Sequence, residues 1–258
     1  MVESASITAM ILDIVICIGV PVGALGYMLF KRQRPLIPFL AGFAVYIVFQ
    51  LVLYLTFMGL IVNTGWYQNM LNNAWLFGLF AGISMGIFTE VGRYAGFKLL
   101  LRDRRLFSDG ISMGIGYAGA ESIIVGGLQY YGSLTLANMI NSGQTDQLVA
   151  MTNAESANEA IKSLTSVLPF DLYLGGLDRI FLFIIHIALT ILILLGIRKR
   201  KLSFLGIAVL MHLFIDGVPG ALGLSNLAIV IYAGVLAALS VVFILKARKQ
   251  FEPALKEA

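Results

Sequence analysis

Residues 177–201 read LDRIFLFIIHIALTILILLGIRKRK, and this stretch decides the class of the fold. Its first part, 177–197, is dominated by Ile, Leu and Phe, and it has the length of roughly 20 apolar residues that an α-helix needs to cross a bilayer. Basic residues fill 198–201, and such clusters are typical of the cytoplasmic end of a membrane-spanning helix. The stretch therefore predicts a transmembrane helix.

The composition of the whole chain also indicates a membrane protein. Of its 258 residues, 59% are hydrophobic and 12% are charged, about half the charged share of a soluble domain. A chain with so little polar surface cannot fold as a water-soluble enzyme. Its net charge of +4 comes from clusters beside apolar runs, so we expect no nucleic-acid partner. The lone cysteine, Cys17, excludes an internal disulfide framework.

Similar apolar runs recur along the chain. They predict an all-α fold, a polytopic membrane helical bundle of about seven transmembrane helices in a single domain over 1–258. The first run is longer than the apolar core of a signal peptide and ends in basic residues, so we expect it to be retained. The predicted spans are 7–30, 37–61, 74–99, 107–132, 177–197, 202–219 and 226–245.

Positive charges predict the orientation of these spans. Basic clusters follow the first, third, fifth and seventh span, at 31–34, 98–105, 198–201 and 246–249. All four fall on one side of the membrane, which the positive-inside rule identifies as cytoplasmic. We therefore expect the N-terminus outside and the C-terminus in the cytoplasm of a bacterial cell, with the protein in the cell membrane.

The longest segment between predicted spans runs from 133 to 176. On the predicted orientation it is extracytoplasmic. Within it, 148–168 has a pattern that favours an amphipathic helix lying on the outer membrane surface. A plain connecting loop is the alternative.

Ionisable side chains inside the predicted spans indicate a functional site, because a charge deep in a bilayer costs at least a few kcal/mol. A rise of about 1.5 Å per residue puts the deepest ones about 12 to 21 Å from the cytoplasmic ends of their spans, in one layer. Asp13, Asp178 and Arg179 lie nearer the outer ends, and we expect them at the rim. The deep residues, which we predict to form the catalytic site, are Glu90, Arg93, Glu121, His186, His212 and Asp216.

Spacing predicts which of these residues meet. Glu90 and Arg93 are three residues apart and His212 and Asp216 are four apart, so each pair shares one helix face. Glu121 has no ionisable partner on its own span, and it therefore needs one from another helix. The alternative to catalysis is a structural role, as an ion pair or a hydrogen-bonded pair between spans.

These groups suit hydrolysis of a peptide bond. A glutamate can take a proton from water, a histidine can stabilise the oxyanion, and an arginine can orient the base. No Gly-x-Ser-x-Gly pattern is present, which argues against a serine nucleophile. A metal is the alternative, because His186 and His212 with Glu121 or Asp216 make a plausible set of zinc ligands, although the chain has no His-Glu-x-x-His motif.

At these positions the chain resembles the YhfC family of intramembrane peptidases. It also resembles, more distantly, the group that holds the CAAX prenyl endopeptidases and the PrsW proteases. The residues that carry the resemblance are Glu90-x-x-Arg93, Tyr117-Ala-Gly-Ala-Glu121, the lone His186 and His212-x-x-x-Asp216.

The resemblance implies a glutamate-dependent protease in the membrane. It implies that Glu90 activates water, that Arg93 orients it, and that Glu121 takes the place of the acid on the second helix. His212 and Asp216 correspond to the pair that stabilises the oxyanion. This sequence has one glutamate in the first motif where the wider group has two, so both Glu90 and Glu121 stay candidates for the base. The lone His186 has no counterpart in that group, which keeps zinc open.

We therefore expect an intramembrane endopeptidase that acts on a membrane protein or a lipidated peptide within the lipid bilayer. It needs no cofactor if the water is activated by a glutamate, and zinc if it is activated by a metal. The main alternative is a proton-coupled transporter that uses the same buried Glu, Arg and His groups. A non-catalytic scaffold is a third possibility.

Overall fold

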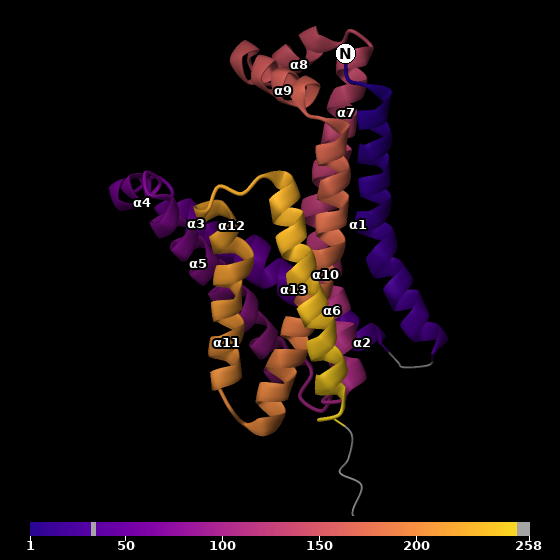
Figure 1. Ribbon diagram of the computed structural model, residues 1–258, viewed down its shortest axis with the longest axis vertical. Coiled ribbons are helices and arrows are strands. Elements are labelled where there is room, and N and C mark those ends of the chain that lie inside the picture. Colours follow the sequence, from indigo (N-terminus) through magenta and orange to yellow (C-terminus); the bar gives the residue numbers. More distant parts are fainter. Residues whose placement is uncertain (32–34, 252–258) are drawn as a thin grey trace, which may run out of the picture.

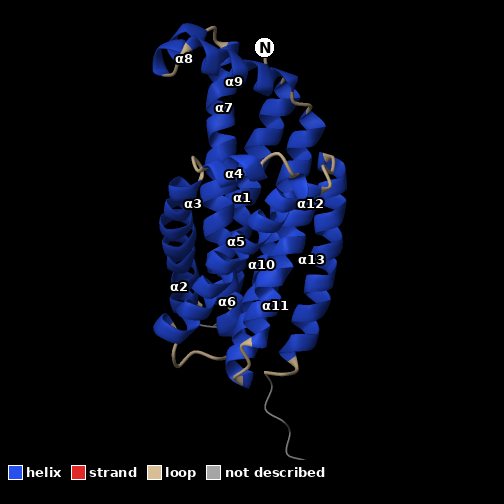
Figure 2. Ribbon diagram, turned by 90° about the vertical axis from the view of Figure 1, so that its left-hand side faces the viewer, coloured by secondary structure: helices blue, strands red, loops and turns tan. Residues whose placement is uncertain are grey.

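The computed structural model describes residues 1–31 and 35–251, and within these ranges it contains helices and no strands. Seven helices there are long and apolar enough to cross a membrane, which confirms the predicted all-α bundle. Figure 1 shows them as tall, closely packed helices, and Figure 2 shows the same bundle from the side. The spans are Ser4–Phe30, Leu36–Ile61, Ala74–Leu100, Phe107–Asn141, Pro169–Lys199, Ser203–Ala221 and Asn226–Arg248.

Several spans contain more than one helical element because π-helical turns interrupt the α-helix. The elements in chain order are α1 (Ser4–Phe30), α2 (Leu36–Tyr46), η1 (Ile47–Tyr54), α3 (Leu55–Ile61), α4 (Gly65–Met70), α5 (Ala74–Ala95), η2 (Gly96–Leu100), α6 (Phe107–Glu121), η3 (Ser122–Gly127), α7 (Leu128–Asn141), α8 (Thr145–Met151), α9 (Ala154–Ser166), α10 (Pro169–Lys199), α11 (Ser203–His212), η4 (Leu213–Gly217), α12 (Val218–Ala221) and α13 (Asn226–Arg248).

The helices on either side of the predicted extracytoplasmic segment 133–176 extend into it at both ends. The fourth span continues as α7 to Asn141, and α10 begins at Pro169, where proline suits the first turn of a helix. Polar residues interrupt the apolar pattern in these outer turns, so the sequence did not predict that the turns are part of the spans. What remains between the spans is α8 and α9, so the expected amphipathic helix 148–168 is shorter and starts at Ala154. Figure 1 shows both helices above the rest of the bundle, carried by α7 and α10.

Glycines let α5 and α11 touch through their backbones. A Cβ atom on Gly86 would lie 2.7 Å from the carbonyl oxygen of Val209 and 2.9 Å from the Cβ of His212. A Cβ atom on Gly82 would lie 2.6 Å from the Cα of Leu213. Small residues are the usual means of close helix packing in a membrane, where apolar side chains gain little by leaving lipid. The result is that His212 is pressed against the face of α5.

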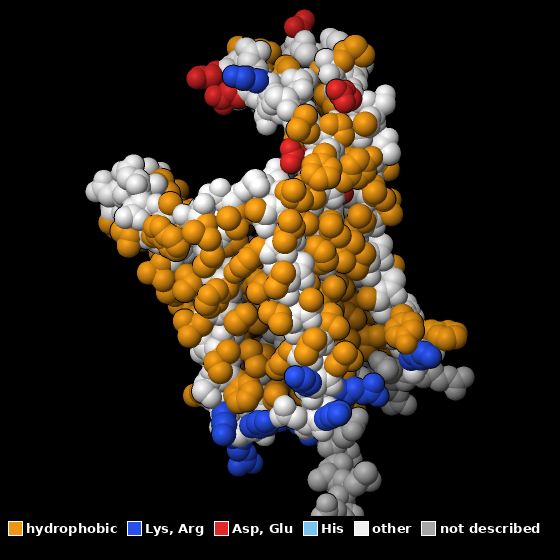
Figure 3. Space-filling model, in the orientation of Figure 1, with side chains coloured by type: hydrophobic (Ala, Val, Ile, Leu, Met, Phe, Trp, Pro, Cys, Tyr) orange, Lys and Arg blue, Asp and Glu red, His pale blue; other side chains and the backbone are white. Residues whose placement is uncertain are grey.

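Charge is unequally divided between the two ends of the bundle. Figure 3 shows Lys and Arg gathered at the end where α13 finishes and Asp and Glu gathered near α8 and α9, with hydrophobic surface between. Three predicted basic clusters, 98–105, 198–201 and 246–249, lie on described residues. The fourth, 31–34, lies outside them except for Lys31. The asymmetry is what the positive-inside rule requires for the predicted orientation.

We predict that the end bearing α9 faces the outside of the cell. In a Cys17→Ser background, a cysteine placed at exposed Glu155 should react with a membrane-impermeant maleimide on intact cells. A cysteine at exposed Lys249 should react only after lysis. The reverse labelling pattern would overturn the orientation.

We also predict that Gly86→Ala destabilises the protein, because the added methyl group meets the backbone of α11. Overpacking of this kind costs about 1–3 kcal/mol. Gly206→Ala on α11 is the matched control, because a Cβ atom there meets nothing within 4 Å. The melting temperature in detergent should fall for the first variant and hold for the second. Equal melting temperatures would show that the close contact between α5 and α11 is not needed.

Candidate active site

The predicted site residues form one continuous chain of polar contacts in the interior of the bundle. Glu90 and Arg93 project from α5, Glu121 ends α6, and His186 lies in the middle of α10. His212 ends α11, and Asp216 follows in η4. Read along the contacts, the order is Glu121, His186, Arg93, Glu90, His212 and Asp216.

Arg93 joins the two halves of this chain. Its Nη1 forms an ion pair with Oε1 of Glu90, one helical turn away, as the spacing predicted. Its Nη2 lies 2.6 Å from Nδ1 of His186 on α10. The same guanidinium lies over the ring of Tyr117, 4.1 Å from the ring centre. Arg93 thus contacts groups from α5, α6 and α10 while its own side chain is fully buried.

The two histidines each reach a carboxylate on another helix. Nε2 of His186 lies 2.8 Å from Oε2 of Glu121, which supplies the partner that Glu121 lacks on its own span. Nε2 of His212 lies 2.9 Å from Oε1 of Glu90. Nδ1 of His212 lies 2.6 Å from Oδ2 of Asp216, which is the predicted pair on one helix face.

The chemistry of arginine fixes the tautomer of His186. A guanidinium has donors and no acceptor, so Nδ1 of His186 must accept a hydrogen bond from Arg93. The proton of the neutral ring therefore sits on Nε2, which donates to Glu121. The consequence is a directed sequence of hydrogen bonds from Arg93 through His186 to the carboxylate of Glu121.

Exposure changes along the chain of contacts. The side chains of Glu90 and Arg93 at its centre are 0% exposed, whereas Glu121 is 23% exposed and Asp216 is 33% exposed. Oε2 of Glu90 has no hydrogen-bond partner among the described residues. The site therefore has a fully buried, charged centre and two partly exposed carboxylates at its ends.

Three of these side chains come directly before or within π-helical turns. η3 begins at the residue after Glu121, and η4 begins after His212 and contains Asp216. A π-helical turn widens the backbone and changes the direction in which the following side chains point, and such turns are frequent at functional sites. No residue type signals them, so the sequence did not predict them.

A neutral layer lies beside the charged chain, and of its residues only Tyr117 was singled out in the sequence. Nε2 of Gln50 in η1 donates to Oγ1 of Thr89 at 2.6 Å, and the hydroxyl of Tyr117 donates to the same oxygen at 3.2 Å. All three side chains are buried. These side chains carry no charge, so the cost of burying charge did not identify them. The available signal was Gln50 itself, an amide in the middle of an apolar span, where it needs a partner.

The expected rim residues divide into two groups. Asp178 and Arg179 are partly exposed, whereas Asp13 is fully buried, so the expected rim position is wrong for Asp13. Its carboxyl group lies against Gly176 of α10, and neither oxygen has a hydrogen-bond partner among the described residues. Its place near the outer end of α1 did not reveal that α10 covers it.

The arrangement does not fit zinc held by His186, His212 and Glu121. A zinc ligand needs an imidazole lone pair. The lone pair of His186 already accepts from Arg93, and both ring nitrogens of His212 face carboxylates. A guanidinium cation also lies between Glu90 and His186, where it would repel a second cation. Within residues 1–31 and 35–251, no group of three or more His, Cys, Asp or Glu side chains is arranged to hold a metal ion.

Comparison with known proteins identifies the family to which the chain belongs. The model of the family described as "YhfC intramembrane metalloprotease" matches residues 16–246. The "Uncharacterized membrane protein YhfC" of Bacillus subtilis (strain 168) is 28% identical over 260 positions, which cover 98% of this chain and 100% of that protein. No solved structure matches. The chain is therefore a multi-pass membrane protein, and it belongs to the YhfC intramembrane metalloprotease family.

Proposed function

We propose that the protein is an intramembrane endopeptidase in which Glu121 activates water. The description of its family supports protease activity in the membrane. The observation that carries the assignment is the exposure gradient, since Glu121 is accessible while Glu90 is completely buried. A base must touch the water that it deprotonates. Of the two candidate bases that the sequence left open, Glu121 meets this requirement.

In the proposed reaction the carboxylate of Glu121 takes a proton from water, and the resulting hydroxide attacks the carbonyl carbon of a peptide bond. His186, held by Arg93, fixes the direction of the Glu121 carboxylate. For His212 to stabilise the oxyanion of the tetrahedral intermediate, one of its ring nitrogens must exchange its carboxylate partner, Glu90 or Asp216, for the oxyanion. The proton on Glu121 then passes to the leaving nitrogen as the C–N bond breaks.

The buried Glu90–Arg93 pair has a positioning role in this mechanism. Its two charges neutralise each other where no water is available, and its outer contacts reach one histidine of each accessible pair. Replacing either partner leaves the other as an uncompensated buried charge, which is strongly destabilising. The pair therefore couples the fold to the geometry of the catalytic groups.

The substrates that suit this site are membrane proteins or lipidated peptides. The polar groups lie inside a bundle whose outer surface is apolar, so a substrate must reach them from the bilayer or along its surface (Figure 3). A lipid anchor or a membrane-spanning segment would raise the local concentration of substrate at the site.

We predict that Glu121→Gln abolishes cleavage and leaves the fold intact. The amide cannot take a proton from water, and loss of a general base typically costs 10²–10⁴-fold in rate. The measurement is cleavage of single-span membrane proteins in proteoliposomes, together with the melting temperature. Full cleavage by this variant would exclude Glu121 as the base.

We predict a different outcome for Glu90→Gln, which is the matched control. This change removes a buried charge that faces Arg93, so the melting temperature should fall together with activity, by an amount that corresponds to about 3–5 kcal/mol. A stable and inactive Glu90→Gln protein beside an active Glu121→Gln protein would move the base to Glu90. Substrate uptake without peptidase activity in the same proteoliposomes would instead indicate a transporter.

We predict that cleavage does not depend on a bound metal. Purified protein should keep its activity after prolonged incubation with a strong chelator, with elemental analysis used to show that metal has left. Stoichiometric zinc that is lost in His186→Ala and in His212→Ala, together with loss of activity in chelator, would contradict the arrangement of donors described above.

A further inference from the structure

The π-helical turn that carries Asp216 leaves one backbone carbonyl without a partner in its own helix. The N–H of Val218 bonds to the carbonyl oxygen of Leu213, which closes a ring of π size. The next residue, Pro219, has no N–H. The donors that would serve the carbonyl of Phe214 in an α-helix or a π-helix are therefore both unavailable. A free carbonyl at this depth in a membrane needs a donor from elsewhere.

Tyr232 on α13 supplies that donor. Its hydroxyl lies 2.9 Å from the carbonyl oxygen of Phe214. Phe214 stands midway between His212 and Asp216, so the contact fixes the backbone between the two members of the pair. A phenolic O–H can serve as this donor without bringing a charge into the bilayer.

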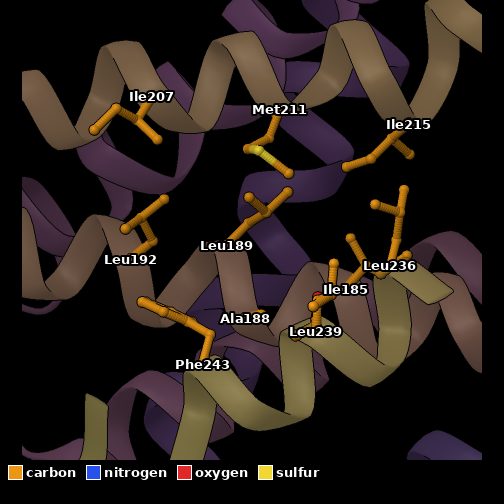
Figure 4. A pocket seen from close by; sticks show the side chains of 11 residues that line it. Ile185, Ala188, Leu189, Leu192, Ile207, Met211, Ile215, Leu236, Leu239 and Phe243 are labelled. Carbon is orange, nitrogen blue, oxygen red and sulfur yellow. The ribbon is translucent and has the colours of Figure 1, made fainter. Parts of the chain in front are cut away.

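Side-chain packing does not join α11 and α13 directly below this contact. An apolar cavity of about 330 Å³ separates them, and α10 forms its floor. Figure 4 shows Met211 and Ile215 of α11 and η4 facing Leu236 and Leu239 of α13 across it. The cavity lies beside the catalytic layer, because Met211 and Ile215 directly precede His212 and Asp216 in the sequence. The hydrogen bond of Tyr232 therefore bridges two helices that are separated by this cavity.

We propose that Tyr232 is a positioning residue that holds η4 in the conformation in which His212 and Asp216 face each other. This role rests on the proposed peptidase function. α5 constrains η4 from one side through the backbone contacts of Gly82, and Tyr232 constrains it from α13. Without the hydroxyl the carbonyl of Phe214 stays unpaired, and η4 relaxes toward an α-helical turn that changes the direction of Asp216.

The first test is Tyr232→Phe in the full-length protein, with Tyr27→Phe as the control, because Tyr27 is an exposed tyrosine of α1. We expect kcat to fall about ten-fold with KM unchanged, since small displacements of catalytic groups produce rate losses of this order. The melting temperature and the control variant should stay near the parent. An unchanged kcat, or a loss of kcat that occurs only with a lower melting temperature, would overturn the proposal.

The second test restores a donor within the helix. Pro219→Ala supplies the missing N–H, so a turn of π size can close on the carbonyl of Phe214 without Tyr232. The double variant Pro219→Ala/Tyr232→Phe should therefore recover most of the lost kcat. A double variant as slow as Tyr232→Phe alone would show that the hydroxyl does not act through this carbonyl.

Hydrogen–deuterium exchange tests the contact independently of catalysis. In Tyr232→Phe, amides of residues 211–221 should exchange faster than in the parent, and amides of α6 should not change. The Pro219→Ala change should reverse the effect. Faster exchange in Tyr232→Phe, together with a parent protein that cleaves no substrate, would confirm the contact and overturn the peptidase function. Unchanged exchange in Tyr232→Phe would overturn the contact itself.

Discussion

The positive charge of Arg93, held where water cannot reach it, is the constraint on which the rest of the site depends. A guanidinium in the interior of a membrane protein must satisfy its charge and its donors with protein groups. Glu90 neutralises the charge, Nδ1 of His186 takes one donor, and the ring of Tyr117 covers one face. The contacts with His186 and Tyr117 fix α10 and α6 relative to α5, whereas Glu90 lies on α5 itself. The relative positions of these groups therefore depend on the charge of one buried cation, whose Nε has no hydrogen-bond partner among the described residues.

The helices can meet this requirement because glycine replaces side chains where they cross. Gly82 and Gly86 bring the backbone of α11 onto α5, and Gly114 brings α6 within 2.9 Å, measured from an added Cβ atom, of the Cα of Ile187 on α10. These crossings position both histidines, because His186 directly precedes Ile187 and His212 lies against Gly86. In lipid, helices associate through close packing and hydrogen bonds, because lipid tails solvate apolar side chains well. Close packing at glycines and pairing of buried charges therefore both hold the helices together.

Much of this could be predicted from the sequence, because hydropathy and charge report directly on the membrane. Apolar runs located seven spans, and the cost of burying charge identified the six residues that meet inside them. The spacing of Glu90 and Arg93 predicted their pairing. The link between Arg93 and His186 could not be predicted, since their separation in sequence says nothing of how α5 and α10 pack. The π-helical turns were also hidden, because they depend on how a whole span is accommodated by its neighbours, as was the burial of Asp13 under α10.

The order of the polar groups has a further consequence for the transfer of protons between them. A line of carboxylates and imidazoles that runs through several membrane helices resembles a wire along which protons hop. Such a wire conducts only if every member can release its proton in turn. Arg93 interrupts the line at its middle, and an arginine does not give up its proton in a protein. Proton transfer at the Glu121 end of the line is thereby separated from proton transfer at the Asp216 end.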